Sequence, residues 1–490
     1  MSRPLHICFV AYRGNMRCGG QGVYLWFLAR ELARLGHRVD VLVGPPYPDA
    51  MPFARSVTRL PNERFWGRWF AGEAAAMLPR PQPLRIFEPL NFYELAASRI
   101  GFLPEPFAFS LRALRALATQ LLAGAAYDVI HDVQCLGWGV LGMRALGLPV
   151  VSTVHHPLTV DRRASFARDT SFREALGTAT FYPVAMQSRV ARRLDRLLTS
   201  SRASARQIAR DFRVDPARIH MVANGVDTEL FAPDPQVRRD PDEILCVARA
   251  ADPNKGVKTL IEALPHLPRS ARLTLVDEAH ANNPALVHAH QLGCADRVRV
   301  VGPLPVEDLV TRYRRAALVA VPSRYEGFGL PAAEAMACGT PVVASASGAL
   351  PEVLEAGGGG VLVPRDAPEA LANGIRRLLE RPEQRAELGA RGRKGVVAAY
   401  SWPRIAERTA AIYADIARAR RGRPTSSTTS ASAGTRAPSQ SSAESAPRAA
   451  PAGSRSSTPD HDGIPQPSET PSTRSSSRLA DACSRIRPSS

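Results

Sequence analysis

Two glutamates lie eight residues apart in the segment Glu326–Glu334, and the turn Gly327-Phe-Gly329 directly follows the first. Residues 335–345 read as the end of a helix at Gly339 and then a buried strand. We therefore expect Glu326 on a loop at a helix N-terminus and Glu334 about two turns into that helix. A helix start offers unpaired N–H groups and a partial positive charge, which suit a phosphate or a polyol oxygen. Two carboxylates beside such a site can hold the hydroxyl groups of a sugar.

The elements that must position these carboxylates alternate between strand and helix. In the second half, apolar runs predict strands at 243–247, 272–276, 298–301, 318–321, 341–344 and 360–363, with helices near 257–265, 306–315, 331–338 and 368–380. In the first half, a strand at 5–10, a Gly-rich turn, a helix at 23–35 and a strand at 38–43 begin a similar series, which continues with strands near 128–131, 149–154, 196–200 and 219–222. The sequence thus predicts an α/β protein with two doubly wound parallel sheets in tandem.

The predicted domain organisation has five parts. Residues 1–230 form the first domain, the Pro- and Asp-rich segment 231–243 is a linker, and residues 244–400 form the second domain. A helix at 401–420 follows, and the Ser/Pro/Thr/Arg-rich tail 421–490 is expected to be disordered. Residues 44–108 are rich in Pro, Phe and Trp and are expected to form long loops or an insertion.

The composition excludes several classes of protein. The chain has 490 residues, and its net charge of +18 comes from 60 arginines and only three lysines, a bias that looks like GC-rich coding. We therefore predict no nucleic-acid partner, and an anionic substrate or an anionic membrane surface fits the basic charge better. The seven cysteines include no C-x-x-C pair, which indicates a reduced protein without disulfides or a zinc site. With no 18-residue apolar run and no signal peptide, the expected location is the cytoplasm, with peripheral association at the inner membrane face as a second option.

The segment Glu326–Glu334, together with the following Ala335-Met-Ala-x-Gly-x-Pro-Val-Val-Ala-Ser345, resembles the signature of family 4 glycosyltransferases (glycosyl transferase group 1). The resemblance covers residues 5–415, and its further motifs are Gly19-Gly20, Thr153-Val-His155, Asn224-Gly-Val-Asp227, Arg249 and Lys255. These are retaining enzymes of the GT-B fold, in which two Rossmann-like domains face each other across a cleft. The resemblance implies that the C-terminal domain holds a nucleotide-diphosphate sugar, that the N-terminal domain holds the acceptor, and that the last helix crosses back to the first domain.

The resemblance also implies roles for the second-domain residues. Arg249 and Lys255 would stabilise the negative charge that grows on the leaving nucleoside diphosphate, in place of a metal ion. Glu326 would bind hydroxyls of the donor sugar, and Glu334 those of the ribose. The N–H groups of Phe328, Gly329 and Leu330 would meet the sugar or the diphosphate. Without the resemblance, the two cations are also compatible with a solvated loop, and Glu334 with a helix-start carboxylate.

In the first domain, Gly19 and Gly20 would wrap a phosphate or admit the acceptor, with a tight turn as the alternative. His155 would lie near the reacting centre, with His156 as its structural neighbour, although a His at a strand end is often only hydrogen-bonded. The aromatic residues Phe65, Trp66, Trp69 and Phe70 suggest an acceptor- or membrane-facing loop, with core packing as the alternative.

The expected reaction is a metal-independent, retaining transfer of a sugar to a hydroxyl of a glycan, lipid or small molecule, in cell-envelope polysaccharide or glycolipid biosynthesis. Asp240-Pro-Asp242 has D-x-D spacing but lies in the predicted linker, so no metal or other cofactor is predicted. Two positions depart from the family: Ala248 replaces a Gly, and Asp277-Glu-Ala-His280 replaces a Gly-x-Gly turn near the nucleotide, which leaves the donor open. The alternatives are a GT-B sugar-nucleotide epimerase or phosphorylase, and a non-catalytic membrane-associated scaffold.

Overall fold

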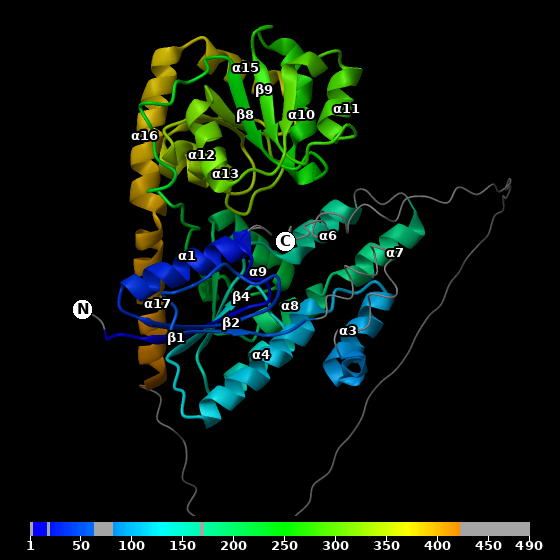
Figure 1. Ribbon diagram of the computed structural model, residues 1–490, viewed down its shortest axis with the longest axis vertical. Coiled ribbons are helices and arrows are strands. Elements are labelled where there is room, and N and C mark those ends of the chain that lie inside the picture. Colours follow the sequence, from blue (N-terminus) through cyan, green and yellow to red (C-terminus); the bar gives the residue numbers. More distant parts are fainter. Residues whose placement is uncertain (1–2, 17–19, 63–81, 167–170, 422–490) are drawn as a thin grey trace, which may run out of the picture.

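The computed structural model describes residues 3–16, 20–62, 82–166 and 171–421. Two α/β halves lie one above the other, and each consists of a parallel sheet between layers of helices (Figure 1). Gly19, the four aromatic residues Phe65, Trp66, Trp69 and Phe70, and the tail 422–490 lie outside the described residues, so the expectations for them stay predictions.

The first half contains a seven-stranded parallel sheet in the order β3-β2-β1-β4-β5-β6-β7. Its strands are β1 (His6–Ala11), β2 (Arg38–Val43), β3 (Ser56–Arg59), β4 (Val129–Val133), β5 (Val150–Thr153), β6 (Arg196–Thr199) and β7 (Ile219–Met221). Its helices are α1 (Gly20–Arg34), α3 (Pro89–Arg99), α4 (Glu105–Leu122), α5 (Trp138–Ala145), α6 (Leu158–Phe166), α7 (Phe172–Phe181), α8 (Val184–Ala191) and α9 (Arg202–Phe212), with 3₁₀ turns η2 (Pro83–Phe87) and η3 (Pro216–Arg218). In the register of this sheet, Ile7 lies opposite Val39 on one side and Val129 on the other.

The second half contains a six-stranded parallel sheet in the order β10-β9-β8-β11-β12-β13. Its strands are β8 (Glu243–Val247), β9 (Arg272–Val276), β10 (Val298–Val301), β11 (Leu318–Val321), β12 (Val342–Ser345) and β13 (Gly360–Val363). The helices are α10 (Val257–Ala263), α11 (Pro284–Gln291), α12 (Val306–Arg315), α13 (Leu330–Ala337), α14 (Leu350–Gly357), α15 (Pro368–Leu379), α16 (Pro382–Tyr400) and α17 (Trp402–Arg421), with 3₁₀ turns η4 (Pro253–Lys255), η5 (Leu264–His266) and η6 (Ala295–Arg297).

Each sheet has a point where the strand order reverses, between β1 and β4 in the first half and between β8 and β11 in the second. Ligands of open α/β sheets bind beyond the carboxyl ends of the strands at such a switch point. The loop after β8 carries Arg249 and Lys255, and the loop after β11 carries Glu326. The fold therefore places the candidate cations and the first candidate carboxylate on adjoining loops.

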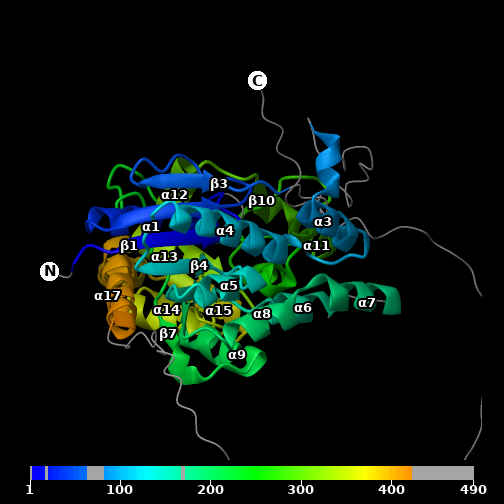
Figure 2. The same cartoon turned by 90° about the horizontal axis from the view of Figure 1, so that it is seen from below.

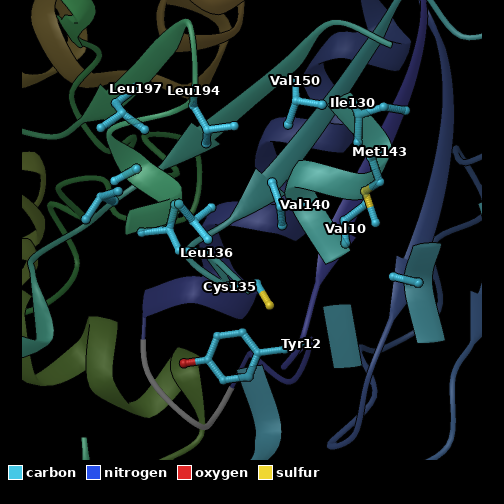
Figure 3. Packing of buried hydrophobic residues seen from close by; sticks show 14 of the residues in the cluster. Val10, Tyr12, Ile130, Cys135, Leu136, Val140, Met143, Val150, Leu194 and Leu197 are labelled. Carbon is cyan, nitrogen blue, oxygen red and sulfur yellow. The ribbon is translucent and has the colours of Figure 1, made fainter. Parts of the chain in front are cut away.

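Apolar side chains fill both faces of each sheet. Figure 3 shows part of the core on one face of the first sheet, where Val10, Ile130 and Val150 of the strands meet Val140 and Met143 of α5. The core on the other face is built from α1 and α17, and the second sheet has two similar cores. The sheets are thereby buried on both sides, as all-parallel sheets require.

The chain crosses between the halves twice at one place. The N–H of Val226 donates to the carbonyl of Tyr400 (2.7 Å), and a side chain at Gly225 would collide with the ring of Trp402. From there α17 runs back along the first half and packs against α1, in line with α16 on the same side of the molecule (Figure 1).

The prediction of long loops for residues 44–108 was wrong in part, because this stretch contains β3, η2, α3 and the start of α4. Seen from below, α6 and α7 extend away from the body on the side opposite α17 (Figure 2). None of the described helices is both long enough and apolar enough to cross a membrane.

Candidate active site

The loop between β11 and α13 brings Glu326 to the carboxyl edge of the second sheet. Gly329 precedes α13 with a φ of 97°, and a Cβ there would lie 2.8 Å from a Leu350 methyl group, so only glycine fits. The N–H groups of Phe328, Gly329 and Leu330 find no acceptor among the described residues. The start of α13 therefore offers free donors and a positive dipole end.

Lys255 forms an ion pair with Glu326. Its Nζ lies 2.8 Å from Glu326 Oε1, and the hydroxyl of Ser323 donates to the same oxygen (2.8 Å). The side chain of Glu326 is 10% exposed and that of Lys255 31%. Burial acts to lower the pKa of Lys255, but the charge and hydrogen bond of Glu326 outweigh it, so the pKa is raised and the ammonium stays charged.

Arg249 is exposed, and no hydrogen bond or ion pair of its guanidinium occurs within the described part of the chain. Its loop is fixed by Asp277, whose Oδ2 accepts the N–H of Ala250 (2.9 Å) and the side-chain amide of Asn283 (2.9 Å). Asp277, the first residue of the segment that departs from the family pattern, therefore ties the loop after β9 to the loop that carries Arg249.

Glu334 is the fifth residue of α13, so it lies little more than one turn into the helix rather than two. Its Oε2 accepts the hydroxyl of Tyr313 (2.8 Å). Burial raises the pKa of Glu334 to about 7, although the bond from Tyr313 acts in the opposite direction. The carboxyl therefore changes charge near neutral pH.

His155 follows β5 at the carboxyl edge of the first sheet. Its backbone N–H donates to Gln134 Oε1 (2.9 Å), the residue is 9% exposed, and Tyr24 packs edge-on against the ring at a centroid distance of 4.9 Å. Both ring nitrogens lack a hydrogen-bond partner. Burial, aided by the neighbouring His156, lowers the pKa of His155 to about 3; the amide of Asn224 lies beside the ring and opposes this, without reaching hydrogen-bond geometry. The ring is thus neutral, and two polar atoms remain for a ligand.

His156 has a different environment from its neighbour. Its Nε2 lies 3.0 Å from Asp161 Oδ2. Burial acts to lower the pKa of His156, but Asp161 outweighs it and the pKa is raised; Lys255 and Glu326 act on the same ring with opposite signs. We predicted a structural role for His156, and its electrostatic interaction with Lys255 and Glu326 becomes evident only in the fold.

The two halves meet at the Gly327-Phe-Gly329 turn. A Cβ on Gly327 would lie 2.9 Å from the carbonyl oxygen of His155, and a Cβ on Gly20 would lie 3.8 Å from a Leu330 methyl group. Gly20 begins α1, and packing against the described residues leaves room for a side chain there. The structure thus brings His155 and Gly20 of the first half to the loop that carries Glu326.

The Asp240-Pro-Asp242 motif is structural. Asp240 pairs with Arg272 (3.0 Å), and Asp242 accepts the hydroxyl of Ser270 (2.8 Å). Among the described residues, no group of three His, Cys, Asp or Glu side chains could hold a metal ion.

The similarity to known proteins extends over both halves of the chain. Residues 229–395 match the family described as Glycosyl transferases group 1, and residues 19–225 match the Glycosyl transferase 4-like domain. The chain is 40% identical over 413 residues to the MMP alpha-(1->4)-mannosyltransferase of Mycolicibacterium hassiacum, which covers 84% of this chain and 98% of that protein. It is 32% identical to the D-inositol 3-phosphate glycosyltransferase of Xylanimonas cellulosilytica, over 84% of this chain and 95% of the relative.

Two solved structures share the fold. Sucrose-phosphate synthase from Thermosynechococcus elongatus superposes with a TM-score of 0.62 at 23% identity, over 85% of this chain and 100% of that chain. HepE from Anabaena, solved in complex with UDP-glucose, superposes with a TM-score of 0.60 at 20% identity, over 84% of this chain and 100% of its own.

Proposed function

Because this chain belongs to the glycosyl transferases group 1 family, also numbered family 4, and is a glycosyltransferase with the GT-B fold, we propose that it transfers a sugar from a nucleotide-diphosphate donor to a hydroxyl group with retention of configuration. The observation that carries the proposal is the ion pair of Lys255 and Glu326 beside the free N–H groups at the start of α13. A cation, a carboxylate and a helix start together suit a diphosphate joined to a polyol.

The negative charge that develops on the leaving diphosphate meets Arg249, Lys255 and the start of α13. Such fixed donors stabilise a transition state because they need no reorganisation when the charge appears. In this proposal, Glu326 accepts hydroxyls of the donor sugar and Glu334 accepts those of the ribose. The leaving phosphate takes the acceptor's proton, so the reaction requires neither a protein nucleophile nor a metal ion.

His155 contributes a neutral ring at the edge of the first domain. With its pKa lowered to about 3, it adds no positive charge beside the anomeric carbon, where the transition state is itself cationic. One ring nitrogen donates and the other accepts, so the ring is suited to a sugar hydroxyl. A buried polar group without a partner costs about 1–3 kcal/mol, and a bound sugar would remove that cost.

A screen of UDP-, GDP- and ADP-sugars by thermal shift, followed by mass spectrometry and anomeric NMR of the products, tests this proposal. We expect one donor class to stabilise the chain and the product to keep the donor's anomeric configuration, with turnover unchanged by EDTA. Lys255→Ala should lower kcat by about two to three orders of magnitude, by analogy with the loss of one oxyanion donor.

Lys258→Ala is the matched control, because this lysine lies on α10, its side chain is 72% exposed, and it pairs with Glu262 of the same helix at 3.7 Å. An inverted product, a loss of activity in EDTA, or equal turnover by Lys255→Ala and wild type would each refute part of the proposal. A free sugar phosphate or an epimerised donor as the product would favour the phosphorylase or epimerase alternative.

The acceptor class is a separate part of the proposal. Two relatives are named as a mannosyltransferase and a D-inositol 3-phosphate glycosyltransferase. Because a mannosyltransferase transfers mannose, we propose a mannosyl nucleotide as the first donor and inositol phosphates as the first acceptors to assay. Membrane association is likewise a proposal, tested by cosedimentation of the full chain with anionic vesicles.

A further inference from the structure

The N-terminus of α9, in the first half, is capped by a carboxylate of the second half. The N–H groups of Arg202 and Ala203 donate to Glu352 Oε2 (2.7 Å) and Oε1 (2.8 Å), respectively. Glu352 belongs to α14, and its side chain is 17% exposed. The first N–H groups of a helix have no partner within the helix, and its dipole favours an anion there. One carboxylate therefore satisfies two backbone donors across the boundary between the halves.

The same turn of α9 also holds the loop that carries Glu326. The hydroxyls of Ser200, Ser201 and Ser204 all lie within hydrogen-bond distance of the Gly327 carbonyl, at 3.0, 2.8 and 3.2 Å. The Ser204 hydroxyl also reaches the carbonyl of His155 (3.2 Å). Ser204 thus contacts both the strand end that carries His155 and the turn that follows Glu326.

These contacts lie between two halves that the described chain connects near residues 225–226 and 400–402. Two domains joined at one crossing point can rotate about it, and a few connecting residues then absorb the change. Opening the cleft would break both bonds to Glu352 and all the hydroxyl bonds to Gly327. The closed arrangement is therefore stabilised by groups outside the donor site.

We propose that residues 200–204 and Glu352 form an interdomain latch, and that Glu352 and Ser204 are positioning residues that hold the Glu326 loop against His155. The role in positioning rests on the proposed function, whereas the latch itself does not. Closing the cleft during transfer excludes water, which would otherwise hydrolyse the donor.

The latch can be measured without any ligand. Labels at Leu122→Cys, at the end of α4, and Val287→Cys, on α11, lie on different halves and on exposed positions (Figure 1). Double electron–electron resonance on the full chain, with Cys18 and Cys483 replaced by serine, reports the separation of the halves. We expect Glu352→Ala to shift the closed-to-open equilibrium at least about tenfold toward open, which corresponds to about 1.4 kcal/mol, because the substitution removes both hydrogen bonds to the carboxylate.

Turnover with UDP-glucose and GDP-mannose as probes then tests the positioning role. Glu352→Ala should lower kcat about tenfold and raise the ratio of donor hydrolysis to transfer, with a smaller change in the donor KM. Glu352→Gln keeps one acceptor oxygen and should fall between wild type and Glu352→Ala. Glu355→Ala is the control, because the Glu355 side chain is 75% exposed and pairs with the exposed guanidinium of Arg202 rather than with the backbone of α9.

The outcomes separate the two proposals. An unchanged distance distribution in Glu352→Ala overturns the latch. An open distribution with wild-type kcat and hydrolysis ratio overturns the positioning role. If kcat falls together with the melting temperature while neither the distances nor the hydrolysis ratio change, Glu352 is only structural. If the wild-type chain transfers no sugar from any donor, the proposed function fails, and the distance measurement still decides the latch.

Discussion

We predict that donor binding depends on pH through Glu334, the proposed ribose ligand, whose pKa is raised by burial. Burial raises this pKa to about 7, and only the ionised carboxylate accepts two ribose hydroxyls without losing an oxygen to a proton. With that pKa, the ionised fraction falls about tenfold from about pH 8 to about pH 6. We therefore expect the donor Kd to rise up to about tenfold over this interval.

Two substitutions isolate this carboxyl group. Glu334→Gln should bind the donor more weakly at high pH and lose the Glu334 part of the pH dependence, while any contribution of His156 remains. Tyr313→Phe removes the hydrogen bond that lowers the pKa of Glu334, so the midpoint should move to higher pH.

Isothermal titration calorimetry with the nucleoside diphosphate at several pH values measures both effects. Proton release or uptake appears as a dependence of the binding enthalpy on the buffer. If the donor Kd of wild type and of Glu334→Gln has the same pH profile, Glu334 is not the titrating group. If Tyr313→Phe moves the midpoint of the profile to lower pH, the hydrogen bond from Tyr313 does not lower the pKa of Glu334.

Two further predictions concern stability and are checked by thermal or urea unfolding. Gly329→Ala should lower the free energy of unfolding by about 1–3 kcal/mol, because the new Cβ meets Leu350 at 2.8 Å in a left-handed backbone conformation. Gly177→Ala in α7 is the control, since no described residue lies within 4 Å of its Cβ position. An equal loss of stability in both variants would contradict this explanation. Lys255→Ala should destabilise the chain by about 2 kcal/mol because it leaves Glu326 buried without its cation. Adding Glu326→Gln to this variant should recover most of that loss. If the double variant is less stable than Lys255→Ala alone, the broken ion pair is not the cause.

The strands of the second half could be predicted because each is a short segment rich in apolar residues, with at least two β-branched residues. Helix α16 (Pro382–Tyr400) was missed, since Gly389, Gly392 and Gly395 lower the helix propensity of the segment. In the structure, side chains at Gly389 and Gly395 would collide with the carbonyls of Gly339 and Gly357. The glycines permit close packing of α16 on its neighbours, a tertiary reason that local sequence does not reveal.

The candidate residues could be named from the sequence, but their partners could not. Lys255 and Glu326 are 71 residues apart. From the sequence we predicted that Lys255 contacts the leaving diphosphate and that Glu326 contacts the donor sugar, but not that the two side chains contact each other. The reversal of strand order between β8 and β11 is what places their loops side by side. The hydrogen bond from Tyr313 to Glu334 has a similar origin, since Tyr313 lies on α12 and Glu334 on α13.

The two glycines of the Gly327-Phe-Gly329 turn are required for different reasons, and the motif alone does not distinguish them. Gly329 is required by its own backbone, with a φ of 97° at the start of α13. Gly327 is required by the other half of the molecule, because a Cβ would lie 2.9 Å from the His155 carbonyl and disturb the bonds from α9. A substitution at Gly329 should therefore act within the second half, whereas one at Gly327 should act on the contact between the halves and hence on cleft closure.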